Sequence, residues 1–307
     1  MTKIGIVTDS TADLPTAVTS RYGIQVIPLT VELNGDQYLD RVNISNAEFY
    51  DQLSHLAELP KTSLPKPELF TEAYQRLVDD GCEVIYSLHL SAELSGTVNA
   101  ARLIAQSFKS ADIRVWDSRT ATMGLGLLTQ LLAERVEAGA TPEACDAFLE
   151  EAIQKLKIYF LLDSLDNLEK GGRIGKAGYL VGSILNIKPI LILSDGVISV
   201  HKKMRGNNKD RVIKELTDAV MADIDPGKPV HIVAGYNNDL QSAEQFIHVL
   251  QKRLPAVDPD YFELGAVVTT HIGLGAYGAA FFQTERQGYY GSLRSSDETN
   301  EKTAKTW

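Results

Sequence analysis

The first half of the chain alternates short apolar strands with helical segments, and this alternation constrains the fold more than any other feature. Ile4–Val7 and Val84–Leu88 are apolar runs that predict buried strands. A polar or glycine-rich segment follows each of them, at Thr8–Pro15 and at Leu94–Thr97. Repeated strand and helix predict a parallel sheet covered by helices on both faces. Ligands bind such sheets outside the carboxyl ends of the strands, so these two segments are candidate ligand loops.

The remaining elements follow from the same two patterns. Apolar, mostly β-branched runs predict further strands at Gln25–Glu32, Ile113–Trp116, Ile158–Leu162, Ile187–Leu193, Val197–Lys203, Val230–Ala234 and Phe262–Val268. Apolar residues at helical spacing predict helices at Ser45–Ala57, Leu69–Asp79, from Gly96 onward, and at Thr120–Glu137, Pro142–Lys157, Ser164–Lys170, Lys209–Ala222 and Ser242–Lys252. Ser45 and Glu48 form a capping-box pattern, and the pairs Asn34-Gly35 and Asp195-Gly196 are typical of hairpin turns.

After Lys157 the pattern changes from alternating strand and helix to a mixture that contains an antiparallel pair. The sequence therefore predicts an α/β protein of two domains, the first with a parallel sheet and the second of the α+β kind. We expect the first domain, which carries the ligand loops, at residues 1–160 and the second at residues 161–284. Residues 285–307 are rich in Ser, Thr, Glu, Asn and Lys, and we expect a polar, disordered tail there.

The composition is that of an ordinary globular protein, with 44% hydrophobic and 23% charged residues among 307. The net charge of −10 argues against nucleic acid or an anionic membrane as the main partner. No apolar stretch is long enough to span a bilayer, and Met1-Thr2-Lys3 leads into a strand without a targeting signal. The two cysteines predict no disulfide framework. These features together favour a cytoplasmic protein with peripheral membrane contact or none.

Two hydroxyl-bearing loops are candidate anion-binding sites. Thr62 and Ser63 precede Leu64–Pro67, where prolines hold the chain extended. Ser95 and Gly96 open a helix, where backbone N–H groups and the helix dipole favour a carboxylate or a phosphate, and the glycine allows close approach. Both patterns are explained equally well by hydroxyl groups that only cap the N-terminus of a helix.

The segment Asp9–Asp13 after the first strand also has two interpretations. Its acids and hydroxyls can cap the next helix, with Pro15 at an early helical position. Alternatively, Ser10 and Asp13 help to shape the wall of the ligand cleft. Two acids without further ligands do not predict a metal site.

Three isolated basic residues complete the set of candidates. Lys170–Lys176 places cations, among them Arg173, on a glycine-rich turn. This turn either ends a helix or, with the apolar residues that follow as far as Leu185, forms a mobile lid. Arg205 ends a basic run, and His271 follows the last predicted strand. A single histidine more often serves as a structural hydrogen bonder than as a catalytic group.

The motifs of several enzyme classes are missing. The chain has no Gly-x-x-x-x-Gly-Lys-Ser/Thr sequence, and Ser95 lacks the preceding glycine of a hydrolase elbow. The glycines of Gly273–Gly278 have dinucleotide-binding spacing, but no strand, helix or acidic residue follows to support that use. The sequence therefore predicts no cofactor, no metal and no nucleophile paired with a base.

Taken in order, these segments resemble the DegV family of bacterial fatty-acid-binding proteins. The matching motifs are Thr8-Asp9-Ser10, Thr62-Ser63-Leu64-Pro65, Ser95-Gly96-Thr97, Gly171-Gly172-Arg173-Ile174, Lys188-Pro189-Ile190 and His271-Ile272-Gly273. The resemblance extends from about Lys3 to about Phe282. One position departs from the family, since Leu274 stands where the last motif usually has proline. Leucine removes a restraint on φ and adds apolar bulk, which affects the shape of the loop and leaves His271 in place.

The resemblance implies a Rossmann-like N-terminal α/β domain and a C-terminal α+β domain with a mixed sheet. One long-chain fatty acid would lie between them, with its carboxylate held by hydroxyl groups and its tail in an apolar tunnel of the second domain. The ligand-binding residues that the resemblance implies are Thr62, Ser63, Ser95, Gly96, Arg205 and His271.

The resemblance also implies a protein partner. In many bacteria such a protein presents its fatty acid to a separate ATP-using fatty acid kinase, which makes an acyl phosphate for phospholipid synthesis. The residue that matches Arg173 is implicated in the work with the kinase. The protein would then be a carrier without catalytic residues. Two alternatives stay open: a hydrolase or transferase that acts on a small anionic substrate in the same cleft, and a structural or regulatory module.

Overall fold

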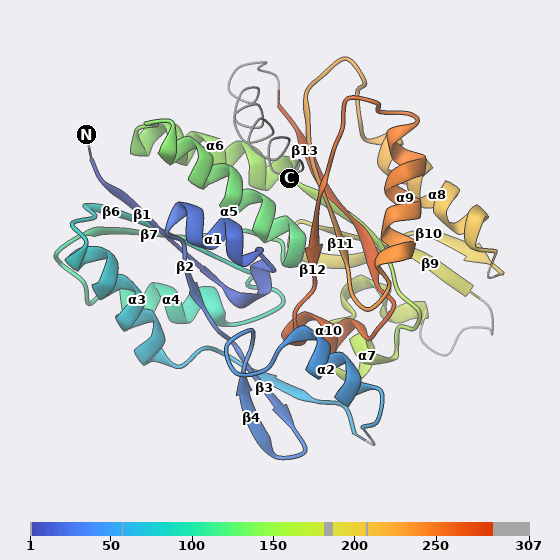
Figure 1. Ribbon diagram of the computed structural model, residues 1–307, viewed down its shortest axis with the longest axis horizontal. Coiled ribbons are helices and arrows are strands. Elements are labelled where there is room, and N and C mark those ends of the chain that lie inside the picture. The colour runs from blue at the N-terminus through green and yellow to red at the C-terminus, as the bar shows by residue number, and fades with distance from the viewer. Residues whose placement is uncertain (1, 57, 181–186, 207, 285–307) are drawn as a thin grey trace, which may run out of the picture.

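The two large sheets of the molecule lie on either side of a central pair of helices. The computed structural model describes residues 2–56, 58–180, 187–206 and 208–284. Helices α5 (Thr122–Glu137) and α6 (Pro142–Lys155) occupy the middle layer, and further helices cover the outer face of each sheet (Figure 1). The first sheet is parallel and the second is mixed, so the predicted fold class is confirmed.

The first sheet has a topological switch point between two of its strands. Its four strands run in the order β2 (Gln25–Ile27), β1 (Ile4–Asp9), β6 (Val84–His89) and β7 (Asp112–Asp117). Helices α1 (Thr16–Tyr22) and α5 pack on one face, while α3 (Pro67–Asp79) and α4 (Thr97–Ala105) pack on the other. The chain therefore leaves β1 and β6 toward opposite faces. The crevice between the carboxyl ends of these two strands is the place where such sheets bind ligands.

A small antiparallel sheet extends from the first one. Its central strand β3 (Thr30–Leu33) pairs with β4 (Asp36–Leu39) and with β5 (Lys61–Ser63). Helix α2 (Asn46–Leu53) lies beside it, and Ser45 and Glu48 form the predicted capping box. The hairpin predicted at Asn34-Gly35 is confirmed.

The prediction of one continuous strand over Gln25–Glu32 is wrong. The chain leaves the first sheet after Ile27 and enters the small sheet at Thr30. Pro28 lies between them and has no N–H group to donate to a ladder. An apolar run shows that both segments are buried, but it does not show that they belong to different sheets.

Among the residues that the structure describes, the second sheet has six strands, and β11 pairs with β12 in parallel while the other neighbouring pairs are antiparallel. The order is β10 (Val197–Arg205), β9 (Ile187–Ser194), β8 (Lys157–Leu161), β13 (Tyr277–Gln283), β11 (Val230–Tyr236) and β12 (Asp260–Glu263). Helices α8 (Lys209–Ala222) and α9 (Leu240–Gln251) cover its outer face, and α5 and α6 cover part of its inner face (Figure 1). The predicted hairpin at Asp195-Gly196 joins β9 to β10.

Short helices connect the strands near the middle of the molecule. They are η1 (Ser10–Ala12), α7 (Asp166–Lys170), η2 (Gly175–Leu180) and α10 (Ala266–Ile272). The prediction of a strand over Phe262–Val268 is wrong, because β12 ends at Glu263 and α10 begins three residues later. Tertiary partners stabilise this helix: Asp13 accepts a hydrogen bond from the N–H of Gly265, and Asp40 accepts one from Ala266. Local preference for strand is overridden by these distant carboxylates.

Helix α5 packs closely against both halves of the molecule. A Cβ atom at Gly126 would lie 2.3 Å from the carbonyl oxygen of Ala12 and 2.6 Å from the ring of Phe262. Glycine is therefore required for α5 to approach η1 on one side and β12 on the other. Buried side chains from both large sheets meet around this helix in one apolar cluster, so the two expected domains share part of their core. The boundary at residue 160 stays a prediction.

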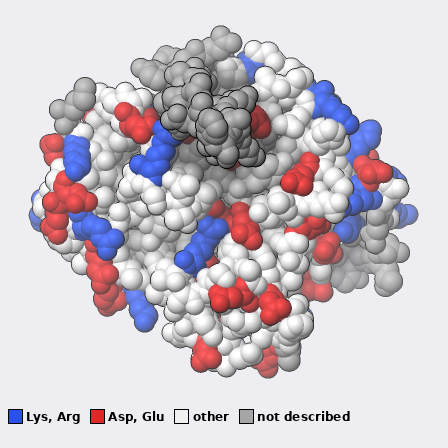
Figure 2. Space-filling view, viewed as in Figure 1, with Lys and Arg blue, Asp and Glu red and all other residues white. Residues whose placement is uncertain are grey.

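Within the described ranges, no helix has both the length and the apolar composition that crossing a bilayer requires. Figure 2 shows acidic and basic side chains interspersed over the described part of one face of the molecule.

Candidate ligand-binding site

A largely apolar cavity of about 290 Å³ lies between the two large sheets. This volume is at the lower end of that of small-molecule sites, about 300–1,000 Å³. The apolar lining consists of Leu29, Leu64, Leu90, Leu94, Ala121, Met123, Ile158, Phe160, Leu168, Leu193, Ile198, Leu264, Val267, Val268, Ile272, Ala276 and Tyr277. The polar lining consists of Thr11, Thr62, Ser63, Ser95, Thr122, Arg173 and His271.

The fold explains why these residues meet. Thr11 follows β1 and Leu90 follows β6, so both lie at the switch point of the first sheet. Strands β8, β9, β10 and β13 of the second sheet supply the opposite apolar wall. The cavity therefore uses both sheets and is enclosed only when the two halves pack together.

Thr62 and His271 form the centre of the polar part of the cavity. The Oγ1 atom of Thr62, on β5, lies 2.8 Å from Nε2 of His271, at the end of α10. Burial, together with the positive charge of Arg173, lowers the pKa of His271 to about 4. Its Nδ1 atom is buried and has no hydrogen-bond partner in the described chain. The imidazole is thus neutral at pH 7 and has one unused ring nitrogen.

Two buried acids hold the helix that carries this histidine. The Oδ1 atoms of Asp13 and Asp40 accept hydrogen bonds from the first N–H groups of α10, at 2.7 and 3.1 Å. Burial raises the pKa of Asp40 to about 6 and that of Asp13 well above its ordinary value. Arg41 lies 4.0 Å from Asp13 and donates to the carbonyl oxygens of Leu14 and Glu263. Asp13 therefore acts far from its own loop, as part of the support for the cavity wall.

Ser95 lies on the loop between β6 and α4 and faces the cavity half-buried. The N-cap position of α4 is held by Gly96, and Ser95 precedes it. The Oγ atom of Ser95 accepts a 3.4 Å hydrogen bond from the N–H of Thr97 and lies 2.9 Å from the hydroxyl of Thr97. Gly96 is exposed, and its nearest neighbour is the side chain of Leu64.

Arg173 connects the glycine-rich turn to the loop that carries Ser95. Its Nη1 atom donates to the carbonyl oxygen of Gly171 at 2.6 Å, and its Nε atom donates to that of Leu94 at 3.3 Å. The side chain is exposed and lines the cavity. The expected lid over Arg173 to Leu185 lies partly outside the described residues, which end here at Leu180.

Arg205 is not brought to the cavity. It is exposed at the far end of β10, whereas the cavity residue Ile198 lies near the hairpin tip, paired with Leu193. Seven residues of strand separate the two positions, or roughly 23 Å at about 3.3 Å per residue. Thr62, Ser63, Ser95, Arg173 and His271 do line the same cavity.

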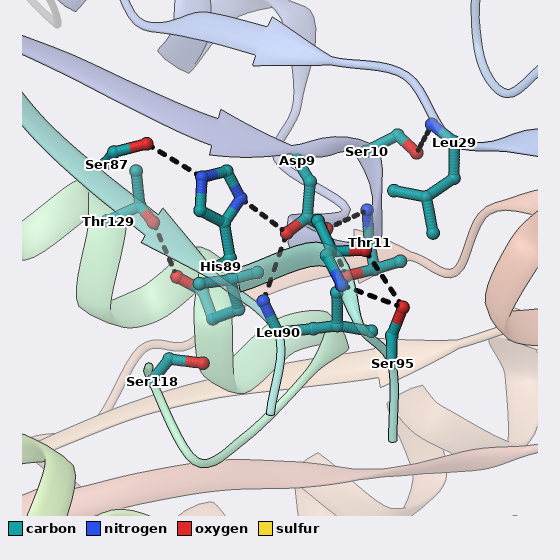
Figure 3. A network of polar contacts seen from close by, with 12 residues as sticks. Asp9, Ser10, Thr11, Leu29, Ser87, His89, Leu90, Ser95, Ser118 and Thr129 are labelled. Atoms are coloured by element: carbon teal, nitrogen blue, oxygen red, sulfur yellow. Dashed lines mark hydrogen bonds and ion pairs between the residues drawn. The ribbon is translucent and has the colours of Figure 1, made fainter. Parts of the chain in front are cut away.

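The sequence alone did not point to a buried chain of polar side chains beside the cavity. Nε2 of His89 lies 2.7 Å from Oγ of Ser87, and Nδ1 lies 3.0 Å from Oδ2 of Asp9 (Figure 3). Tyr74 extends the chain through a 2.8 Å contact with Ser87. Two polar residues that alternate at the end of an apolar strand, Ser87 and His89, were the available signal.

These side chains follow the order of a serine, histidine and aspartate catalytic triad, but they are not accessible to a substrate. Ser87, His89 and Asp9 are all 0% exposed, and none of them lines the cavity. A nucleophile needs a substrate within reach, so the arrangement does not make Ser87 a catalytic residue. The sequence-based expectation that no nucleophile is paired with a base is therefore corrected in one respect. A hydroxyl group does lie beside an imidazole, but both are buried away from the cavity.

Comparison with known sequences shows the family to which this protein belongs. The sequence profile described as "Uncharacterised protein, DegV family" matches residues 3–284. A DegV domain-containing protein of Streptomyces coelicolor is 38% identical over 276 residues, covering 90% of this chain and 96% of the relative. The chain belongs to the DegV family.

Solved structures of the same family share the fold over nearly their whole length. A DegV family protein from Thermus thermophilus, described as fatty-acid-binding, superimposes with a TM-score of 0.85 at 33% identity and covers 92% of this chain and 100% of its own. A stearic-acid-binding protein from Eubacterium ventriosum superimposes with a TM-score of 0.82 at 27% identity, covering 92% and 98%.

Proposed function

We propose that this protein binds one long-chain fatty acid between its two halves and presents it to a separate ATP-dependent fatty acid kinase in the cytoplasm. The observation that carries the first part is an apolar cavity whose few polar groups belong to mutually contacting loops. Fatty-acid-binding relatives with the same fold support it. The residues from 161 to 284 would supply just over half of the apolar wall together with His271, and those before them the loops that carry Thr62, Ser63 and Ser95.

The apolar lining accounts for the affinity. Burial of an acyl chain contributes about 0.8 kcal/mol per methylene, so about 15 methylenes contribute roughly 12 kcal/mol. Loss of translational and rotational freedom offsets several kcal/mol of that. The polar groups then mainly orient the ligand, because the tail alone supplies enough free energy for tight binding.

The polar lining suits a carboxylate. An unpaired charge in an apolar site costs several kcal/mol, so the ligand's oxygens need donors. Thr62, Ser63 and Ser95 offer hydroxyl groups, and His271 offers an imidazole. No chemistry beyond binding is needed for this role, because these residues supply hydrogen bonds that orient the carboxylate.

Substitution of the hydroxyl groups tests the proposal directly. Ser95→Ala, and separately the double variant Thr62→Ala/Ser63→Ala, should weaken stearate binding by about 1–3 kcal/mol each, because a buried acceptor loses its donor. Native mass spectrometry of protein expressed in bacteria identifies the bound lipid, and displacement of a fluorescent fatty acid measures the Kd. Unchanged affinity in both variants would refute this assignment of the carboxylate.

Presentation to a kinase is tested at Arg173. We expect Arg173→Ala to keep the Kd for stearate within a few-fold of wild type while it slows acyl phosphate formation by the cognate kinase. Lys176→Ala, on the same exposed turn, is the matched control. If the fatty acid bound to Arg173→Ala is phosphorylated at the wild-type rate under limiting kinase, Arg173 has no part in the encounter.

The second candidate function is hydrolysis or group transfer on a small anionic substrate. The buried order of Ser87, His89 and Asp9 is the observation that recommends a test. Steady-state hydrolysis of acyl or phosphate esters that is lost in Ser87→Ala would favour it. Co-purified fatty acid together with no such turnover favours the carrier.

A further inference from the structure

The carboxylate of Asp9 lies at the switch point of the first sheet, where the connections after β1 and β6 leave toward opposite faces. Oδ1 accepts hydrogen bonds from the N–H of Thr11 at 3.1 Å and from its hydroxyl at 2.5 Å. Oδ2 accepts from Nδ1 of His89 and from the N–H of Leu90, both at 3.0 Å. One buried carboxylate thus holds the residues that follow β1 to those that follow β6 (Figure 3).

The hydrogen bonds on Asp9 all run toward its carboxylate. A carboxylate only accepts, so Nδ1 of His89 donates to Asp9, while its Nε2 atom lies 2.7 Å from Oγ of Ser87. The hydroxyl groups of Ser87 and Tyr74 share a hydrogen bond of 2.8 Å. All four donors around Asp9 therefore point toward a single carboxylate. Tyr74 and Ser87 lie at the far end of this row of hydrogen-bonded side chains and do not line the cavity.

The two loops that Asp9 joins form one side of the cavity. Thr11 and Leu90 both line it, and Leu90 begins the loop that carries Ser95. The connections after β1 and β6 depart toward opposite faces of the sheet, and the backbone pairing of these strands ends at Thr8 and Leu88, so it does not hold the two connections together. The distance between the loops then depends on the side chain that bridges them.

We propose that Asp9 is a positioning residue for ligand binding: with His89 it sets the separation of the two loops and thereby places Ser95 against the ligand. This inference rests on the proposed fatty-acid-binding function. It assigns no nucleophile to the chain of side chains. The charge acts on the ligand only through Thr11 and Leu90.

The test compares substitutions at the two ends of this row of hydrogen-bonded side chains, Asp9 and Tyr74. Asp9→Asn keeps the shape but introduces an amide NH₂ that faces a backbone N–H donor, so the loops should separate. We expect the Kd for stearate to rise about tenfold or more. Tyr74→Phe, which removes the distal hydroxyl, should leave the Kd within about twofold of wild type even though a buried hydrogen bond is lost.

Hydrogen exchange separates positioning from general destabilisation. In Asp9→Asn the amides of Thr11 and Leu90 should exchange faster, while the amides of Ile6 and Tyr86, inside β1 and β6, should keep their protection. Thr11→Val removes only one donor and serves as the second variant if Asp9→Asn does not fold. It should raise the Kd several-fold without a matching loss of melting temperature.

The possible results separate the role of Asp9 from the proposed function. Wild-type protein without affinity for stearate would refute the proposed function itself. Wild-type binding with an unchanged Kd in Thr11→Val and in folded Asp9→Asn would overturn only the role of Asp9. That role would also be overturned if Tyr74→Phe loses as much affinity as Asp9→Asn, because the loss of affinity would then follow the loss of stability.

Discussion

At the scale of single residues, the cavity depends on two ionisable groups whose pKa values are shifted by burial so that the neutral form is favoured. Burial raises the pKa of Asp40 to about 6 from 3.8 and lowers that of His271 to about 4 from 6.5. The acid tends to keep its proton and the base tends to lose its own, for the same reason: burial disfavours the charged form. Both groups are connected to the short helix α10, because Asp40 accepts a hydrogen bond from its first residue and His271 lies near its end.

Asp40 should make stability depend on pH in an unusual direction. Because its pKa is higher in the folded than in the unfolded state, the free energy of unfolding should fall as pH rises from about 4 to about 6. Asp40→Asn keeps an oxygen for the N–H of Ala266 and removes this slope. At pH 7 we expect it to be more stable by up to about 3 kcal/mol, at about 1.4 kcal/mol per pKa unit.

Urea unfolding between pH 4 and pH 7 measures this effect. Asp51→Asn, at an exposed position of α2, is the matched control. Parallel stability curves for Asp40→Asn and wild type would contradict the prediction.

Bound stearate should shift the pKa of His271 upward, opposite to the shift that burial causes. A carboxylate beside the imidazole stabilises the charged form, so stearate should raise its pKa from about 4. Without ligand, the neutral ring contributes stability that is lost as pH falls below about 6.5 toward 4. NMR titration with and without stearate measures both values, with the exposed His248 as an internal control. A pKa that falls or does not move would argue against a carboxylate at this position.

At the scale of elements, the first turn of α5 contributes a flexible side chain to the apolar wall. Met123 lines the cavity, and a Cβ atom at Gly235 on β11 would lie 2.6 Å from its Sδ atom and 2.9 Å from its Cε atom. The flexible thioether therefore fills a space that only glycine leaves open on the sheet. Through this contact, the start of α5 should limit the length of the acyl chain that the cavity can accept.

Two substitutions should move the chain-length preference in opposite directions. Gly235→Ala pushes Met123 into the cavity, so shorter acyl chains should be favoured. Met123→Ala opens space, so longer chains should be favoured, with a loss of about 2–5 kcal/mol of stability. The double variant should return toward the wild-type profile. Native mass spectrometry with a mixture of fatty acids measures the profile, and identical profiles in all variants would exclude this role.

At the scale of the whole molecule, the ligand should hold the two sheets together. The cavity is lined from both sides, so bound stearate adds contacts that the unfolded chain lacks. At one hundred times its Kd a ligand stabilises by about 2.7 kcal/mol, which raises the melting temperature of a chain of this length by roughly 4 °C. Octadecanol, with the same tail and no carboxylate, should give a smaller shift. Equal shifts, or none with stearate, would contradict the proposal that the site holds a carboxylate.

Sequence pattern and tertiary structure contributed different parts of this description. Turn pairs, the capping box and the alternation of strand and helix are local signals, so the fold class and most elements could be predicted from them. The continuous strand at Gln25–Glu32 and the strand at Phe262–Val268 were wrong, since sheet membership and the helix start at Ala266 depend on distant partners. Most candidate loops do meet at one cavity, whereas Arg205 does not.

The sequence by itself determined which segments are buried, where the chain turns and which loops carry hydroxyl groups, because hydrophobic periodicity and turn chemistry act over a few residues. Only the tertiary structure decided that Thr62 meets His271 across 209 positions and that Asp9 lies between His89 and Leu90. Hydrogen bonds of this kind form between groups that the packing of whole sheets brings together. No local pattern specifies them, because their free energy depends on burial that exists only after the chain has folded.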